Sequence, residues 1–409
     1  MIYIKKILIT ILTTCLLFSS YTSQIGLANE KTKNTNISST LPTSRLCLYR
    51  QTIESRDEGS HYRNNSTHQE WWYYIAFFNR DDSELKNWSM MVSFNQMGVI
   101  DILFCTIYEE NNISYGGSTS KWKGAMNASG PYVNVEFENS YVTGKYPEWH
   151  IYAEHKRKIT KNNVTVNITY KAKSKPVWLF MNTGHNNSKS KFGHYCIINN
   201  EVNGTVKINE TVYYVHGVGY HEHSWINDEK NHRPKLSFLP KKPKNKEEGT
   251  ADWQLILNIW DFGSIFLDNG WNIFVAKMCQ QSILSRIMPG ELWITADGKN
   301  IAECHYFKFE YLETNKTSIP SIEIPTKIHI KAIFLNTWIK KPLKGMLRLD
   351  LYIEVTNLHE FTWHGSNQSS GVWEAPCKVH GNLKWLRNNI ELKGLAMLEI
   401  TRTAKTETG

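Results

Sequence analysis

The chain has 409 residues, which is long enough for two domains with sizeable cores. Aromatic residues make up 12% of it, a share that favours strands and apolar pockets over helical bundles. Its formal charge of +9 is scattered along the sequence, and no stripe of basic and aromatic residues predicts a nucleic-acid partner. A scattered surplus of this kind is compatible with loose attraction to an anionic membrane or cell envelope.

Residues 1–28 predict a secretory signal peptide. Lys5 and Lys6 form a charged start, residues 7–18 form an apolar core, and Gly26-Leu27-Ala28 supplies small residues for cleavage. An uncleaved membrane anchor is the alternative, but this apolar core is too short to span about 30 Å of hydrocarbon. We therefore expect an exported protein, either secreted or associated with the cell envelope.

Alternation of apolar and polar residues dominates the rest of the chain. In residues 347–355 every second position is Leu, Ile or Val, and the positions between them are mostly polar or charged. This period of two is typical of half-buried strands, whereas no long window has the period of an amphipathic helix. The sequence therefore predicts an all-β protein.

Two polar stretches divide the mature chain. Residues 29–44 are rich in Asn, Thr, Ser and Lys and predict a flexible tether. Residues 227–250 contain three prolines and a lysine-rich run, and they predict a linker. The division leaves an N-terminal domain at 45–226 and a C-terminal domain at 251–409, each the size of one small barrel.

Cysteines and glycosylation motifs leave alternatives open. Six cysteines follow the leader without a CxxC pair, and they could form disulfides or remain buried thiols. Asn-x-Ser/Thr motifs are dense, and Asn163 and Asn167 are predicted to lie on the outward face of a strand. A glycoprotein is therefore expected wherever the host has the machinery.

The first stretch that could carry chemistry is residues 68–74, His-Gln-Glu-Trp-Trp-Tyr-Tyr. On a strand, Glu70, Trp72 and Tyr74 share one face, while Trp71 lies on the other. A carboxylate among large aromatic rings is costly to desolvate, so its pKa would rise and it could act as a general acid. The alternative is a glutamate at a wet rim or in a structural ion pair with a histidine.

The second stretch is residues 217–225, in which alternation places His221, His223 and Trp225 on one face and Tyr220 and Glu222 on the other. Two histidines at i and i+2 have the spacing by which a strand presents metal ligands, but no third ligand is identifiable. No metal or cofactor is therefore assigned. A histidine beside tryptophan could instead donate a proton or orient a ligand, or it could be a satisfied structural residue.

Together these stretches resemble the AttH/CrtC superfamily, which includes carotenoid 1,2-hydratases (hydroxyneurosporene synthases) and Diels–Alderase-type pericyclases. Residues 373–376 (Trp-Glu-Ala-Pro) and 392–399 are similar to the closing strands of that group. The resemblance spans residues 47–401 and implies two consecutive lipocalin-like antiparallel β-barrels. It also implies activity for a His-x-Trp pair that matches His223 and Trp225.

The resemblance implies hydration or cyclisation of an apolar isoprenoid or polyene by acid catalysis, without a redox cofactor. Its candidate catalytic residues are His223, Trp225, Glu222 and Glu70. The residues expected to contact the ligand are Trp71, Trp72, Tyr74, Tyr220 and His221. Two other functions remain open, namely a non-catalytic carrier of an apolar lipid and a metal-dependent enzyme built on the His-x-His pair.

Overall fold

The computed structural model describes residues 52–61, 68–110, 113–156, 162–179, 192–227, 260–278, 290–319, 321–334, 336–337, 347–364, 368–385 and 388–405. The predicted signal peptide (1–28), the tether (29–44) and the linker (227–250) after Asn227 lie outside these residues. Within the described ranges, no helix combines the length and apolar character that crossing a membrane requires. Residues 46–409 group as one compact unit.

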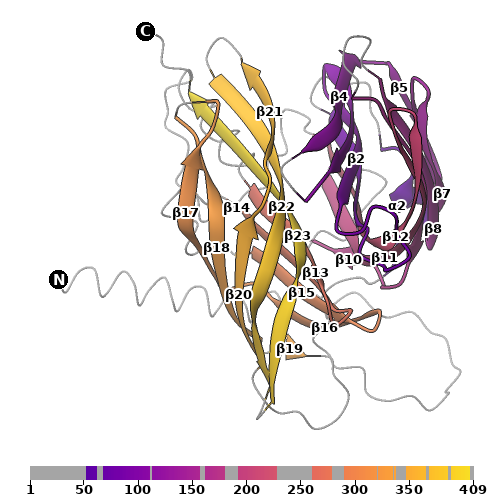
Figure 1. The fold of residues 1–409 in the computed structure, drawn as a ribbon. Coiled ribbons are helices and arrows are strands. Elements are labelled where there is room, and N and C mark those ends of the chain that lie inside the picture. The colour runs from indigo at the N-terminus through magenta and orange to yellow at the C-terminus, as the bar shows by residue number, and fades with distance from the viewer. Residues whose placement is uncertain are drawn as a thin grey trace, which may run out of the picture. The chain divides into compact units, whose positions relative to one another are not determined.

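The first sheet occupies the N-terminal part of this unit (Figure 1). In the described chain it has twelve strands, which pair in the order β4-β3-β2-β1-β12-β11-β9-β8-β7-β6-β5, with β10 on β11, and every pair is antiparallel. The strands are β1 (His68–Phe77), β2 (Ser89–Met97), β3 (Ile100–Tyr108), β4 (Ser114–Trp122), β5 (Met126–Ser129), β6 (Val133–Phe137), β7 (Ser140–Lys145), β8 (Glu148–His155), β9 (Val164–Ala172), β10 (Val177–Trp178), β11 (Phe192–Ile208) and β12 (Thr211–Asn227).

The second sheet follows in the chain. Its eleven described strands pair in the order β17-β18-β20-β22-β23-β13-β14-β15-β16-β19, with β21 on β22, again antiparallel. The strands are β13 (Trp260–Leu267), β14 (Asn272–Met278), β15 (Gly290–Ala296), β16 (Lys299–Cys304), β17 (Lys308–Lys316), β18 (Glu323–Phe334), β19 (Asn336–Thr337), β20 (Leu347–Val355), β21 (His359–His364), β22 (Gln368–Trp385) and β23 (Asn388–Lys405).

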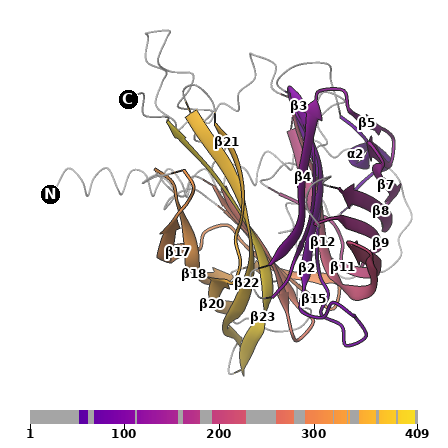
Figure 2. The same cartoon turned by 45° about the horizontal axis from the view of Figure 1, so that its top comes forward.

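The alternation in the sequence explains why these strands curl around apolar interiors (Figure 2). In β6, Val133, Val135 and Phe137 are buried, whereas Asn134 and Glu136 between them are exposed. The same pattern recurs in β20, where the alternate leucines and Ile353 are buried. The predicted all-β class is confirmed, with two consecutive antiparallel sheets.

A third apolar cluster joins the two sheets. The outward face of β1 contributes Tyr73, Ile75 and Phe77, and β13 and β14 contribute rings such as Phe262 and Phe274. Strands β1 and β12 are therefore buried on both faces, because one face lies in the interior of the first sheet and the other packs on the second sheet. Strands that are buried on both faces have nearly continuous apolar sequences, and the sequence of β1 is nearly continuously apolar from Trp71 onward.

A short segment precedes β1 and contains helix α2 (Ser55–Glu58). Two buried tryptophans of the first sheet donate hydrogen bonds to its backbone. The indole nitrogen of Trp178 lies 2.9 Å from the carbonyl oxygen of Thr52, and that of Trp72 lies 3.3 Å from the carbonyl oxygen of Glu58. These bonds hold residues 52–61 against the sheet.

The open questions on cysteines and surface sites are partly answered. Within the described residues, the cysteines at positions 105, 196, 304 and 377 are buried free thiols, whereas positions 47 and 279 lie outside them. Asn167 is exposed and Asn163 is half-buried.

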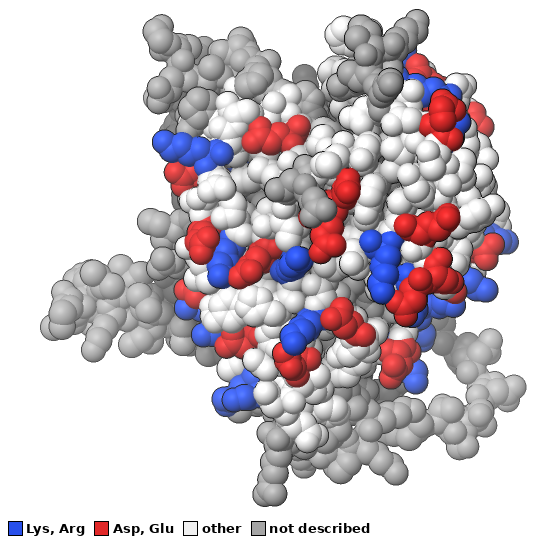
Figure 3. Space-filling model, viewed as in Figure 1, with Lys and Arg blue, Asp and Glu red and all other residues white. Residues whose placement is uncertain are grey.

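On the face drawn in Figure 3, basic and acidic side chains are interspersed, so the net positive charge forms no single patch there.

Candidate functional site

The predicted site residues occupy both faces of β1 and β12, which pair along their length. The register places Glu70 opposite Trp225, Trp72 opposite His223, and Tyr74 opposite His221. These six side chains lie on the face that lines the interior of the first sheet. The other three, Trp71, Tyr220 and Glu222, lie on the face toward the second sheet. The predicted residues therefore form two groups rather than one site.

The inner group centres on the Glu70 carboxylate, which is fully buried. Its Oε1 lies 2.9 Å from His223 Nε2 and 3.1 Å from His61 Nδ1, and its Oε2 lies 3.2 Å from His68 Nε2. The backbone N–H of His61 also donates to this carboxylate, at 2.9 Å. We refer to His61, His68, Glu70 and His223 as the inner histidine cluster.

The electrostatics of this cluster disfavour Glu70 as a proton donor. Burial would raise the pKa of Glu70, but hydrogen bonds from His223, His61 and His68 hold it well below its ordinary value. Burial lowers the pKa of His223, and the contact with Glu70 offsets this only in part. A carboxyl group that remains ionised has no proton to give to a substrate.

The remaining inner residues are packed as core. The His221 ring stacks on Tyr74 at 4.4 Å, and its Nδ1 lies 3.3 Å from the carbonyl oxygen of Tyr73. Burial lowers the pKa of His221 to about 3, so the ring is neutral. Trp225 stacks on His61 at 3.6 Å and also covers Gly193. His221 does not join His223 at a shared ligand position, so the His-x-His spacing alone does not create a metal site.

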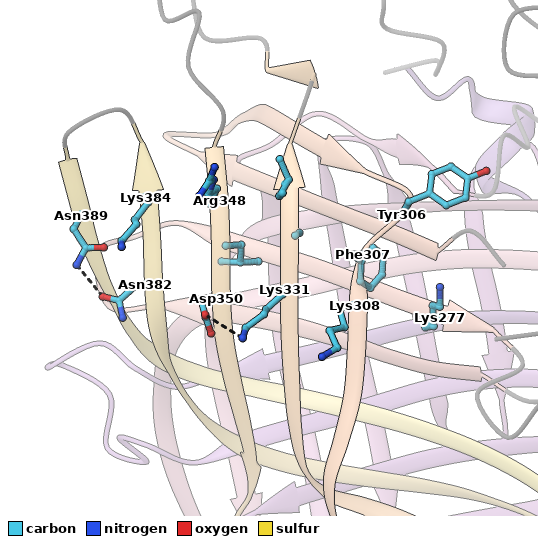
Figure 4. A pocket seen from close by; sticks show the side chains of 13 residues that line it. Lys277, Tyr306, Phe307, Lys308, Lys331, Arg348, Asp350, Asn382, Lys384 and Asn389 are labelled. Atoms are coloured by element: carbon cyan, nitrogen blue, oxygen red, sulfur yellow. Dashed lines mark hydrogen bonds and ion pairs between the residues drawn. The ribbon is translucent and has the colours of Figure 1, made fainter. Parts of the chain in front are cut away.

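A large hollow lies on the second sheet, far in sequence from every predicted site residue (Figure 4). Its volume is about 910 Å³, and strands β17, β18, β20 and β22 contribute to its lining. Two of the five basic side chains in its lining have acidic partners, since Lys331 lies 3.8 Å from Asp350 and Lys308 lies 2.5 Å from Glu310. We find in it no grouping suited to acid or base chemistry among the residues that line it.

A smaller hollow of about 290 Å³ lies between the two sheets. Its walls are mostly apolar and aromatic, and two carboxyl groups open onto it. The residues that line it are Gln69, Trp71, Tyr73, Met91, Ser93, Asn95, Met97, Ile100, Ile102, Phe104, Trp260, Phe361, Ser370, Gly371, Val372, Glu374, Glu399 and Thr401. We call it the inter-sheet pocket.

The two carboxyl groups in this pocket face each other. Glu374 on β22 lies directly opposite Glu399 on β23, and Glu374 is buried whereas Glu399 is half-buried. Tyr73 donates a hydrogen bond to Glu374 at 2.9 Å, and the indole nitrogen of Trp260 donates to Glu399 at 2.5 Å. These donors hold both carboxyl groups in fixed positions at the pocket wall.

Burial and mutual repulsion favour a shared proton between this pair. Burial raises the pKa of Glu399 to about 7, and burial together with the charge of Glu399 raises the pKa of Glu374 well above its ordinary value. Glu374 and Glu399 face each other on adjacent strands, so the charge of Glu399 disfavours ionisation of Glu374. These shifts favour a protonated carboxyl group at the wall of the inter-sheet pocket near neutral pH.

Glu222 supports this arrangement from behind the pocket wall. It accepts hydrogen bonds from Trp71 at 2.8 Å and from Tyr220 at 2.5 Å, and it lies 3.2 Å from His194 Nε2. Burial would raise the pKa of Glu222, but His194 and these hydrogen bonds hold it below its ordinary value. Its negative charge contributes to the raised pKa of both Glu374 and Glu399.

Sequence reasoning missed the acid pair and its partner Tyr73. Glu399 lies in the otherwise apolar run 395–400. A lone carboxylate on a buried strand is costly to desolvate, so this pattern could have identified Glu399 as a candidate functional residue. Glu374 lies in the Trp-Glu-Ala-Pro stretch, whose resemblance predicts a closing strand but no role for its carboxylate. His61 was also missed, and it carries no signal because it lies in an irregular segment outside the strands.

Two solved structures resemble the chain along most of its length. A protein assigned as an AttH from Nitrosomonas europaea has a TM-score of 0.55 at 11% identity, and the match covers 89% of this chain and 98% of that protein. Kievitone hydratase from Nectria haematococca has a TM-score of 0.53 at 11% identity, with 85% of this chain and 91% of that enzyme covered. The chain has the AttH-like fold.

The resemblance to the AttH/CrtC superfamily is thereby confirmed at the level of fold, together with its two lipocalin-like barrels. The second of these two structures is of an enzyme named as a hydratase. No family model and no curated protein sequence matches the chain.

Proposed function

We propose that the chain is a hydratase-like enzyme that protonates a small apolar alkene in the inter-sheet pocket. The observation that carries the proposal is the facing pair of Glu374 and Glu399 in a mostly apolar cavity, where burial raises the pKa of both groups. A general acid needs a proton at working pH and contact with the reacting atom. This pair meets the first condition and lines the cavity that would meet the second.

The residues of the pocket fit each step of such a reaction. The proton of Glu374 adds to one carbon of a C=C bond, and the positive charge develops on the other carbon. The aromatic faces of Trp71, Phe104 and Phe361 stabilise this cation. A water oxygen then bonds to the cation and returns one proton to the carboxylate pair, so that the net change is the addition of one water. If a second C=C bond of the substrate captures the cation first, a ring forms and the positive charge moves to another carbon, which then bonds water or loses a proton to the carboxylate pair.

The size of the pocket bears on the substrate. A volume of about 290 Å³ is at the lower end of the range for small-molecule sites, roughly 300–1,000 Å³. It suits a short isoprenoid or one end of a longer chain rather than a whole carotenoid. The expectation of an apolar unsaturated ligand is thus retained, with a smaller ligand than a full polyene.

The predicted residues keep defined places in this proposal. Trp71 lines the pocket, and Tyr220 and Glu222 lie behind it as positioning residues. His223 and Trp225 lie on the opposite face of the same strands, so they act on the pocket only by holding β1 and β12 in place. This assigns the proton transfer to Glu374 instead of His223, Glu70 or Glu222.

The test uses geraniol, a short isoprenoid alcohol with two C=C bonds, incubated with the purified full chain in heavy water. Protonation by the protein leaves deuterium on carbon, which mass spectrometry detects in the product. Glu374→Gln keeps the shape of the side chain but removes the acid, and we expect it to slow deuterium incorporation about 100-fold or more. Glu391→Gln, an exposed site on β23, is the matched control and should keep the full rate.

Two results would contradict the proposal. Equal rates for the wild type and Glu374→Gln would remove the acid from its assigned role. Recovery of geraniol bound to the protein but unchanged, with no deuterium after long incubation, would favour the non-catalytic carrier instead.

A further inference from the structure

The inner histidine cluster takes no part in the proposed reaction, and its geometry points to another ligand. Three histidine rings converge on the buried carboxylate of Glu70, whereas a structural ion pair needs only one. We propose that His61, Glu70 and His223 bind one divalent metal ion, for which zinc is the best match. Zinc is bound in proteins by imidazole nitrogens and carboxylate oxygens in this combination.

The distances between the ligand atoms suit a single ion. One ring nitrogen of His61, one ring nitrogen of His223 and one oxygen of Glu70 lie within 4.8 Å of one another. Two ligands bound at zinc distances in a tetrahedral site are about 3.4 Å apart. The contacts of 3.1 and 2.9 Å from Glu70 to the two histidines would open by only about 0.5 Å to admit an ion.

The hydrogen-bonding of His223 leaves a place for a cation. Its Nδ1 lies 2.9 Å from the carbonyl oxygen of Asp57, which can only accept a hydrogen bond, so Nδ1 carries the hydrogen. Nε2 is therefore the nitrogen that faces Glu70 Oε1, at 2.9 Å. A metal ion would replace the hydrogen at this nitrogen, because a histidine ligand must present a free lone pair. A metal ion fills that place and is bound by His61 at the same time.

The surrounding contacts hold the ligands in position, as the outer partners of metal ligands do. His68 Nε2 contacts the second oxygen of Glu70 at 3.2 Å, and the Asp57 carbonyl fixes the ring of His223. Trp72 stacks on His223 at 4.7 Å, and Trp225 stacks on His61. Glu70 and His223 are fully buried, whereas 20% of the His61 side chain is exposed, so the ion would enter from the side of His61.

The consequence of such a site is structural. His61 belongs to the segment that precedes the first sheet, whereas Glu70 and His223 lie on β1 and β12. An ion bound by all three joins this segment to the two central strands. Because the site forms only in the folded chain, metal binding contributes directly to the free energy of unfolding.

The experiment measures metal in the purified full chain after dialysis against zinc and then against metal-free buffer. We expect about one zinc per chain by elemental mass spectrometry, and a visible absorption spectrum typical of a tetrahedral site when cobalt replaces zinc. His61→Ala should weaken zinc binding more than 100-fold, because loss of an outer partner alone costs about 10–100-fold. His216→Ala is the control, since His216 pairs with Asp82 in an otherwise similar but surface contact.

The readout does not depend on enzyme activity, so it stands apart from the test of the inter-sheet pocket. A folded wild type, judged by circular dichroism, that retains neither zinc nor cobalt would overturn the metal site. Equal zinc binding by the wild type, His61→Ala and Glu70→Gln would also overturn it. Glu70→Gln alone would not decide the matter, because that change disturbs a buried network, so His61→Ala at the more exposed ligand is the primary variant.

Discussion

At the scale of single residues, the acid pair illustrates how burial sets proton affinity. Within the described chain, neither Glu374 nor Glu399 forms an ion pair with Lys or Arg, and their donors are the neutral groups of Tyr73 and Trp260. Glu70 is fully buried, yet three histidines lower its pKa. Two buried glutamate sites therefore differ in proton affinity because one has basic partners and the other has not.

The raised pKa of Glu399 makes stability depend on pH. In the unfolded chain this group ionises near its ordinary value of 4.5, whereas in the folded chain burial raises its pKa to about 7. The folded state thus holds more protons over this range, so the free energy of unfolding falls as pH rises through it. Glu399→Gln should reduce this fall by about 1–3 kcal/mol, measured by urea unfolding at a series of pH values.

Two comparisons separate the contribution of Glu399 to this pH dependence from the contributions of other carboxyl groups. Glu58 also has its pKa raised to about 7 by burial, so part of the fall should remain in Glu399→Gln. Glu391→Gln, exposed on β23, should leave the profile unchanged. An identical pH profile for the wild type and Glu399→Gln would show that the pair does not hold its proton.

At the scale of elements, the strands could be predicted from the sequence, but the residues that their side chains contact could not. Alternation correctly assigned Glu70, Trp72 and Tyr74 to one face and Trp71 to the other, because the period of a strand is fixed. It could not show that β22 and β23 bring Glu374 opposite Glu399. The register of two paired strands depends on the turn that joins them and on which side chains are buried on each face. The donor Tyr73 lies 301 residues from Glu374, a separation that no local pattern bridges.

A glycine on β11 fixes the position of the indole that packs on the inner histidine cluster. A Cβ atom at Gly193 would lie 2.0 Å from Cζ2 of Trp225. Gly193→Ala should therefore displace this ring and cost about 1–3 kcal/mol of stability, measured by chemical denaturation. Asn203→Ala, exposed on the same strand, should change stability by less than about 0.5 kcal/mol. Equal stabilities for the two variants would show that Trp225 does not pack on this strand.

At the scale of the whole molecule, the proposed chemistry requires both sheets. The first sheet supplies Trp71 and Tyr73 to the inter-sheet pocket, and the second supplies Glu374 and Glu399. Neither sheet alone encloses the cavity or completes the hydrogen bonds of the acid pair. The sequence predicted two barrels and an apolar site, but it could not show whether that site lies inside one barrel or between the two, because the cavity arises only where the outer faces of the two sheets meet.

The measurement that most directly tests the central claim is infrared difference spectroscopy of the full chain at neutral pH. We expect the C=O stretch of a protonated carboxyl group in the wild type, and its loss in Glu374→Gln. Because Glu58 also has a raised pKa, Glu58→Gln identifies the signal that belongs to that residue. A spectrum in which Glu374→Gln removes only an ionised carboxylate signal would contradict the claim that the inter-sheet pocket holds a proton.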